Sequence, residues 1–309
     1  MSRLVKAFKA AIAPSFKTIR WLLSIMIPVS LGVKMLEYFG ILHWIANLIK
    51  PVFSIWGLPG EASLVILSGA LLNIYSAIAI IESLDFTIRE ITIMAIMLLI
   101  AHNLIIETAV QKKTGSSPLS MLAVRLITAF TAGFVFNLIL PENASHLSNA
   151  INTATFSHPP FLEFFLTWAI ATFWLILKII IIIISLQVLH NVLDEYKILD
   201  LLSKGMKPLM RLFGLPLQSS FMWLVANVVG LAWGSAILVE YVKSGKVNKY
   251  EANLLNHHIA VSHSLLEDTL LFMAIGVNAF WITFPRIFLA IVVVWGVRIL
   301  LKNRLQAHL

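Results

Sequence analysis

The sequence places ionisable and amide side chains inside two long apolar runs, where the cost of burying them makes a functional role the first hypothesis. These residues are His102, Asn103 and Glu107 in one run, and His263, Ser264, Glu267 and Asp268 in the other. Imidazole and carboxylate groups bind protons or cations, and together they suit zinc, iron or manganese. The residues predict a solute or ion site. The simpler alternative is that they form buried hydrogen-bonded pairs that hold helices together.

The spacing predicts which of these side chains share a helical face. At ~100° per residue, Asn103 and Glu107 lie on one stripe of their helix. In the second run one stripe holds Asn256, His263 and Glu267, and the neighbouring stripe holds His257, Ser264 and Asp268. His257 and the adjacent His258 lie nearer the start of that helix, where an interfacial position explains them equally well.

An earlier run in each half adds a second wall to the predicted site. Small or polar residues recur every four positions there, at Gly69, Asn73 and Ala77 and again at Ala226, Gly230 and Gly234. Plain helix packing explains the glycines. Packing does not explain the amides and hydroxyls at the same depth, which are Asn73, Tyr75, Ser76, Asn227 and Ser235. We therefore expect Asn73 and Asn227 to contribute to a site for a small polar ligand.

The composition predicts an all-α integral membrane protein. Of 309 residues, 59% are apolar and 12% charged, and the mean hydropathy is +0.90; so few charges cannot cover a soluble surface of this size. The absence of cysteine excludes thiolate metal sites and thiol nucleophiles. We interpret the net charge of +8 as Lys and Arg at the cytoplasmic ends of helices, and expect no nucleic-acid partner.

Hydropathy divides the chain into a basic start, eight apolar runs and two shorter segments. Residues 1–20 predict a basic amphipathic helix on the membrane surface. Eight runs are near the ~20 residues that a crossing needs, and cover roughly 21–39, 60–84, 90–111, 119–140, 161–190, 217–242, 252–275 and 280–301. The shorter segments, 41–56 and 198–213, are either short crossings or re-entrant.

The two halves of the chain are predicted to be repeats, spanning 21–155 and 156–309. The motifs Lys50-Pro51 and Gly57-Leu58-Pro59 recur 157 residues later, as Lys207-Pro208 and Gly214-Leu215-Pro216. Farther along, the separation is 161 residues and pairs Glu90 with Glu251, His102 with His263, and Thr108 with Thr269. Unusual residues repeat in order, so the pattern indicates duplication and not chance similarity of apolar runs.

Charge favours an inverted relation between these repeats, with about five helical segments in each. If both short segments cross, the basic loops at 112–113 and 243–249 and both termini lie on one side. The connection from Glu142 to Pro160, which has no Lys or Arg, then lies on the other side. By the positive-inside rule, both termini are cytoplasmic in a bacterial inner membrane.

Two runs carry a resemblance to a known family. Ile100-Ala101-His102-Asn103-Leu104-Ile105-Ile106-Glu107-Thr108 and Val261-Ser262-His263-Ser264-Leu265-Leu266-Glu267-Asp268-Thr269 each follow a helix led by Gly-Leu-Pro. They resemble the nucleoside-recognition, or Gate, domain, a family that includes the spore maturation proteins A and B. Related domains occur in concentrative nucleoside transporters and in the membrane part of B-type ferrous-iron permeases. The resemblance implies a transport-like or gating role. Unlike the iron permeases, this chain has no GTPase domain and no cysteine, which argues against energised iron uptake.

Three functions follow from these observations. The first is a secondary-transporter-like permease for a small polar solute, nucleoside-like or other, with the site between the repeats. Glu107 and Asp268 would bind a proton or cation, assisted by His102 and His263, because three buried carboxylates, Glu267 included, should not all stay ionised without one. The second is a divalent-metal permease that uses these five residues as ligands. The third is a non-transporting scaffold or accessory protein.

The sequence argues against an enzyme. Ser262 and Ser264 flank His263, but neighbours on one helix cannot align as a catalytic triad does. We expect no cofactor apart from a bound cation or divalent metal. The expected partners are the lipid bilayer and the solute or ion, and a homodimer is left open.

Overall fold

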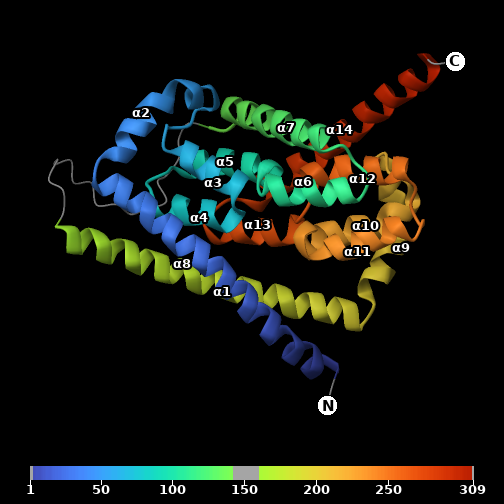
Figure 1. Cartoon of the computed structure of the whole chain (residues 1–309), viewed down its shortest axis with the longest axis horizontal. Coiled ribbons are helices and arrows are strands. Elements are labelled where there is room, and N and C mark those ends of the chain that lie inside the picture. Colours follow the sequence, from blue (N-terminus) through green and yellow to red (C-terminus); the bar gives the residue numbers. More distant parts are fainter. Residues whose placement is uncertain (1–2, 142–159, 308–309) are drawn as a thin grey trace.

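The computed structural model describes residues 3–141 and 160–307, with side chains described except at 3–7, 232–233, 235–236 and 301–307. Every element in the described ranges is a helix (Figure 1), which confirms the all-α class. Two parts of the sequence predictions lie outside these described parts: the side chain of Ser235, and residues 142–159 of the connection from Glu142 to Pro160.

Five helical stretches of the described chain are long and apolar enough to cross a membrane, not the eight that the sequence predicted. They are Phe8–Tyr38, Ile88–Lys113, Pro118–Ile139, Phe161–Glu195 and Ala279–Leu300. The first belongs to α1 (Arg3–Tyr38), a single helix of 36 residues that continues through residue 20, where the sequence predicted a boundary. α1 packs along α8 (Phe161–Glu195). α7 (Pro118–Ile139) and α14 (Ala279–Ala307) lie on the opposite side of the bundle from α1 and α8 (Figure 1).

The run 60–84, expected to cross, is a hairpin of two ten-residue helices, α3 (Ala62–Leu71) and α4 (Ile74–Ser83). A Cβ placed on Gly69 would lie 3.1 Å from the Cβ of Ala77. Eight residues along one helix are ~12 Å apart, so the chain must double back between them. The Asn73 side chain caps α4 by accepting a hydrogen bond from the Ser76 amide at 2.9 Å.

The matching run in the second half, 217–242, is interrupted in the same way. It consists of η2 (Leu217–Ser219), α10 (Ser220–Leu224), the π-helical η3 (Val225–Val229) and α11 (Leu231–Lys243). The turn is at Gly230, whose φ of 91° is one that L side chains rarely adopt. A Cβ on Gly234 would lie 2.6 Å from Val225 Cγ1, so this segment also folds back on itself. The small residues therefore pack the two arms of each hairpin and not one continuous ridge.

Two further helices are broken in the middle. α5 (Ile88–Ala101) continues into α6 (Leu104–Lys113), and α12 (Lys249–Ser262) continues into α13 (Leu265–Ala274). Asn103 and Ser264 take left-handed conformations at the breaks, with φ of 47° and 52°. The predicted stripe that joined Asn256, His263 and Glu267 is therefore wrong, because a break separates the first of these residues from the last.

Each break is held against a hairpin. The Asn103 amide donates to the Gly69 carbonyl at 2.8 Å, and the Ser264 amide donates to the Ala226 carbonyl at 2.9 Å. These acceptors are 157 residues apart and these donors 161, the separations found in the sequence. The same contact thus forms in both halves, and it supplies partners for backbone groups that a broken helix leaves free.

The two short segments lie at opposite ends of the molecule. α2 (Ile41–Phe53), followed by η1 (Ser54–Trp56), lies at one end of the long axis, and α9 (Ile198–Leu212) lies at the other (Figure 1). With 13 and 15 residues, both are shorter than a crossing needs. Most of their side chains are exposed, as expected of amphipathic helices at a membrane interface.

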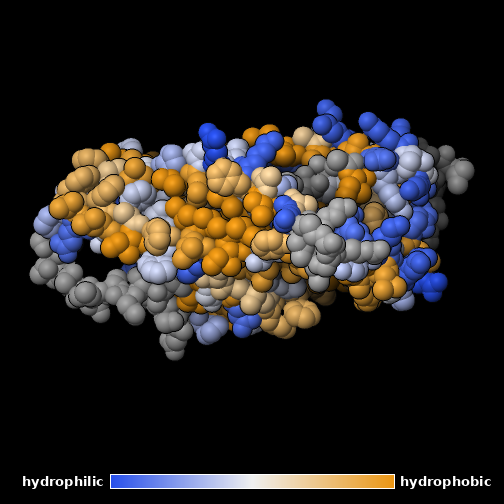
Figure 2. Space-filling view, turned by 90° about the horizontal axis from the view of Figure 1, so that it is seen from below, coloured by the Kyte–Doolittle hydropathy of each residue, from blue (hydrophilic) through white to orange (hydrophobic). Residues whose placement is uncertain are grey.

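The outer surface is that of a protein in lipid. Figure 2 shows apolar side chains over the middle of one face and hydrophilic side chains gathered toward one end. Phe173 and Ile181 on α8 and Phe288 on α14 are 60%, 57% and 65% exposed. Inside, α5 is surrounded by protein, with every residue from Ile91 to Ala101 buried. Exposed aromatic and aliphatic groups around a buried broken helix are stable in a bilayer, which supplies their partners.

Candidate functional site

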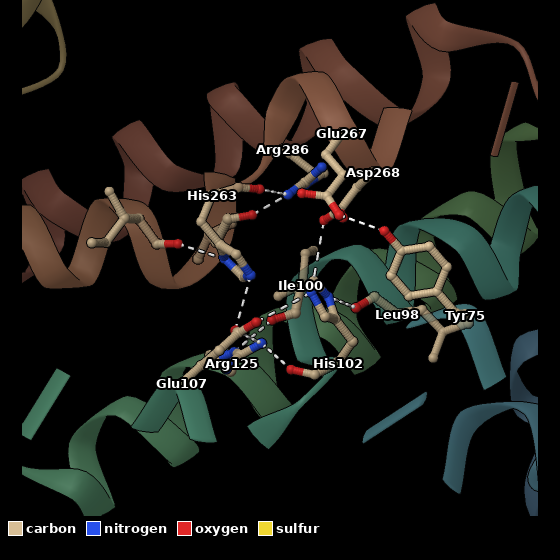
Figure 3. A network of polar contacts seen from close by, with 12 residues as sticks. Tyr75, Leu98, Ile100, His102, Glu107, Arg125, His263, Glu267, Asp268 and Arg286 are labelled. Carbon is tan, nitrogen blue, oxygen red and sulfur yellow. Dashed lines mark hydrogen bonds and ion pairs between the residues drawn. The ribbon is translucent and has the colours of Figure 1, made fainter. Parts of the chain in front are cut away.

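The two helix breaks bring His102 and His263 face to face in the middle of the bundle (Figure 3). Their ring centroids are 4.9 Å apart and the ring planes differ by 36°. Both side chains are buried. The sequence predicted that these repeat-related histidines would share one site, and the structure brings them together.

Both imidazoles are oriented by the same backbone contact. Nδ1 of His102 lies 2.9 Å from the Leu98 carbonyl, and Nδ1 of His263 lies 2.8 Å from the Ile259 carbonyl. A carbonyl oxygen can only accept, so Nδ1 donates in each case. The other nitrogen, Nε2, is therefore the one that each ring presents to the centre of the site.

Glu107 is the carboxylate at that centre. Its Oε1 lies 3.2 Å from His102 Nε2, and its Oε2 lies 2.9 Å from His263 Nε2. The same Oε2 is 2.8 Å from Nη2 of Arg125. Glu107 is 3% exposed. One buried carboxylate of the first half therefore contacts the histidines of both halves.

Two fully buried arginines complete the site, and the sequence interpretation missed both. Arg125 Nε donates to the Ile100 carbonyl at 2.8 Å, and Arg286 Nε donates to the Val261 carbonyl at 3.2 Å. Nη2 of each arginine donates to the carbonyl of the histidine in its own half. The arginines thus cap the carboxyl ends of α5 and α12, where a cation is favoured. Their separation of 161 residues was the signal that could have identified them.

Asp268 and Glu267 approach the centre from the second half. Asp268 Oδ2 lies 3.7 Å from His102 Nε2. Glu267 Oε1 accepts a hydrogen bond of 2.6 Å from the Tyr75 hydroxyl on the first hairpin. With Glu107, the described site holds three carboxylates against two arginines. One negative charge is left uncompensated when the histidines are neutral.

A cavity of about 770 Å³ opens beside this cluster. The first hairpin tip and both helix breaks supply polar groups to its lining: Asn73, Tyr75, His102, Asn103, Glu107, Ser264, Glu267 and Asp268. The tip of the second hairpin contributes Gly230. α1 covers one side with Lys17 and Trp21. The volume is within the ~300–1,000 Å³ typical of small-molecule sites, and few polar groups in an apolar wall are typical as well.

Other predicted residues lie elsewhere. Asn227 is buried in its hairpin and donates to the Trp223 carbonyl at 2.9 Å, and it is not among the residues that line the cavity. Asn256 bonds to Thr114 and Ser116 at 2.9 Å each, which joins the two halves away from the cavity. His257 contacts Ser120, and His258 contacts Trp223 and Ser262. These residues have structural hydrogen bonds, as the simpler reading of the sequence allowed.

Comparison with known proteins places the chain among membrane proteins. The pattern of the Gate family, whose description is nucleoside recognition, matches residues 19–132. The uncharacterized membrane protein YvoD of Bacillus subtilis is 30% identical over 293 residues, which is 94% of each chain. The chain belongs to the Gate family. The resemblance predicted from the two His-containing runs is therefore confirmed.

A shorter match connects the family to an enterobacterial protein. The inner membrane protein YjiG of Escherichia coli K12 is 38% identical over 52 residues, 17% of this chain and 33% of that one. No solved structure matches the chain. The family is transporter-like, and the chain is a multi-pass membrane protein in contact with the lipid bilayer.

Proposed function

We propose that this protein is a secondary-transporter-like permease for a small polar solute in the bacterial inner membrane. One observation carries the proposal: two hairpin tips and two helix breaks meet at a single cavity. Broken helices at mid-membrane expose backbone groups that bind substrates and ions in transporters, and irregular backbone at that depth is tolerated where it lines a cavity. Purely structural helices would gain nothing from four such interruptions.

The proposal includes an inverted topology with three crossings in each half. In this arrangement α1, α5–α6 and α7 cross in the first half, and α8, α12–α13 and α14 cross in the second. Five of these six are the long apolar stretches, and α12–α13 is added as the counterpart of α5–α6. The hairpins and the short helices α2 and α9 do not cross. Three is odd, as five was, so the two halves remain inverted relative to each other. The total of six crossings is even, which puts both termini on the same side, as predicted. Lys112, Lys113, Lys243, Lys246 and Lys249 would then all be cytoplasmic.

A reporter experiment tests this topology. Fusion of a reporter active only in the cytoplasm to the C-terminus should give signal, whereas insertion at Asn149 should not. A reporter active only outside should give the opposite pattern. Cytoplasmic activity at Asn149 would overturn the inverted arrangement.

The lining of the cavity suits a solute that combines a ring with hydrogen-bonding groups. Asn73, Asn103 and Ser264 offer amide and hydroxyl groups, and Tyr75 and Trp21 offer aromatic faces. A nucleoside has this chemistry, as does any small polar aromatic compound. The uncompensated carboxylate supports coupling to a proton or cation, which would enter with the solute.

The absence of cysteine makes a direct test practical. Single cysteines at Asn103 and Ser264 in the cavity, with an exposed control at Leu162 on α8, would be treated with a membrane-impermeant maleimide in right-side-out and inside-out vesicles. Alternating access predicts that each cavity cysteine reacts from both sides, and that uridine or another bound solute slows the reaction. A scaffold predicts no reaction, or reaction from one side with no effect of any solute tested.

A further inference from the structure

The three ligand atoms of His102, Glu107 and His263 lie within 4.8 Å of one another in a buried cluster. This cluster forms one wall of the cavity, to which His102 and Glu107 contribute directly. The interatomic distances are those of side chains arranged around a common centre.

The hydrogen bonds of the histidines create a specific problem at that centre. Both Nδ1 atoms donate to backbone carbonyls, so each neutral ring presents an unprotonated Nε2. These Nε2 atoms face carboxylate oxygens of Glu107 at 3.2 and 2.9 Å. His263 Nε2 makes no hydrogen bond among the described residues despite the 2.9 Å contact. Acceptors facing acceptors at such distances in a buried site require a positive species between them.

We propose that a divalent transition metal binds here, with His102 Nε2, His263 Nε2 and the Glu107 carboxylate as ligands. A proton on one ring satisfies one of the two contacts between Nε2 and carboxylate oxygen, whereas a metal bound to both rings and to the carboxylate satisfies both. Asp268 Oδ2 is placed to be the fourth ligand, because it lies 3.7 Å from His102 Nε2 and has no hydrogen-bond partner in the described structure. Two imidazoles with carboxylates suit zinc, iron, manganese or copper better than magnesium or calcium.

The surrounding groups match those that support metal ligands. A ligand histidine usually donates its other ring nitrogen to a carbonyl or carboxylate, which fixes the ring and its tautomer. Both histidines here do so, to residues four positions earlier. Arg125 holds Glu107 through Oε2 and leaves Oε1 toward His102. Because ligands come from both breaks, the metal would also join the two halves.

The inference does not depend on the proposed transport, since a scaffold could bind the same metal. Binding and flux are therefore measured separately. The full chain would be purified in detergent through a tag without histidine, stripped with a chelator, and titrated with Zn²⁺ by calorimetry. Co²⁺ would be a second probe, because its visible absorption reports imidazole and carboxylate coordination.

We expect one Zn²⁺ per chain. Loss of a ligand should weaken binding by more than the ~10–100-fold typical of second-sphere changes, so His263→Gln and Glu107→Gln should abolish measurable binding. Asp268→Asn should weaken it less. The matched control is His257→Gln, which changes another buried histidine hydrogen-bonded to the backbone of α12 and should keep wild-type affinity.

Folding is checked by circular dichroism and by the detergent melting temperature of each variant. If His263→Gln fails to fold, His102→Gln gives the same test from the other half. Unchanged Zn²⁺ affinity in a folded His102 or His263 variant would overturn the proposal, as would absence of specific Zn²⁺ and Co²⁺ binding by the wild type. Transport in proteoliposomes without metal binding would overturn this inference and leave the permease proposal intact.

Discussion

The first broken helix, α5–α6, and the second, α12–α13, share a framework but differ in the residues that face the cavity. Each has a histidine at its break, a carboxylate five residues later and a buried arginine that caps the break. At the cavity, Asn103 corresponds to Ser264, and Ile106 corresponds to Glu267. The shared residues make the same contacts at both breaks, whereas the unshared residues face the cavity, where Glu267 is a carboxylate with no counterpart in the first half.

The largest expected effect breaks the shared framework. Arg125→Leu leaves Glu107 buried beside no cation, and should lower the free energy of unfolding by about 3–5 kcal/mol. Arg286→Leu removes hydrogen bonds to the Val261 and His263 carbonyls and should cost about 1–3 kcal/mol. Denaturant or thermal unfolding in detergent measures both. Arg20→Leu on exposed α1 is the control, and equal losses in all three variants would refute this role for the buried arginines.

The next effect separates the three carboxylates. Glu107→Gln and Asp268→Asn should flatten the pH dependence of solute binding or flux, and Glu267→Gln should do so by removing the carboxylate that has no counterpart in the first half. We expect each of these variants to lose about tenfold in affinity at the pH optimum, which corresponds to ~1.4 kcal/mol. Proteoliposome uptake across a pH series measures it, with exposed Glu163→Gln on α8 as the control. An unchanged pH profile in all three cavity variants would make these carboxylates structural.

An effect of similar size, on stability, compares the hairpins. Gly69 faces Leu98 so closely that an added Cβ would lie 2.3 Å from Leu98 Cδ2, whereas its counterpart Ala226 already has a Cβ. Gly69→Ala should therefore destabilise the protein by about 1–3 kcal/mol. Gly205→Ala, at a helical position with open space, should be neutral or slightly stabilising. If Gly69→Ala melts at the wild-type temperature, the first hairpin packs less tightly than we infer.

The smallest effect concerns a feature that both halves share. Thr87 begins α5 and Asn248 begins α12, each in a capping box with a glutamate three residues later. Thr87→Ala and Asn248→Ala should each lower the free energy of unfolding by about 0.5–2 kcal/mol, with no change in solute or metal affinity. A selective loss of binding in either variant would show that the helix start is coupled to the site.

The sequence predicted the site better than it predicted the path of the chain. The sequence paired His102 with His263, whose rings lie 4.9 Å apart, and Glu107 with Asp268, which both lie near His102 Nε2. A duplicated sequence repeats the positions that each half contributes. The prediction treated each apolar run as one continuous helix and therefore wrongly placed Asn227 and Asn256 beside the site residues. Arg125 and Arg286 also interrupt apolar runs, but their partners are backbone carbonyls that become available only where α5 and α12 end, and continuous helices were predicted there.

By itself, the sequence determined that the chain is helical and lies in a membrane, since composition and periodicity fix how each segment meets lipid. The repeated motifs predicted two related halves. Only the tertiary structure decided that the runs 60–84 and 217–242 turn back, and that two other helices break at His102 and His263. Hydropathy measures whether a segment avoids water, but a hairpin and a crossing avoid it equally. Tertiary contacts distinguish the two. The left-handed conformations of Asn103 and Ser264 at the breaks become favourable because Gly69 and Ala226, on the hairpins, accept hydrogen bonds from their amides. Buried arginines donate to the carbonyls that the breaks leave free.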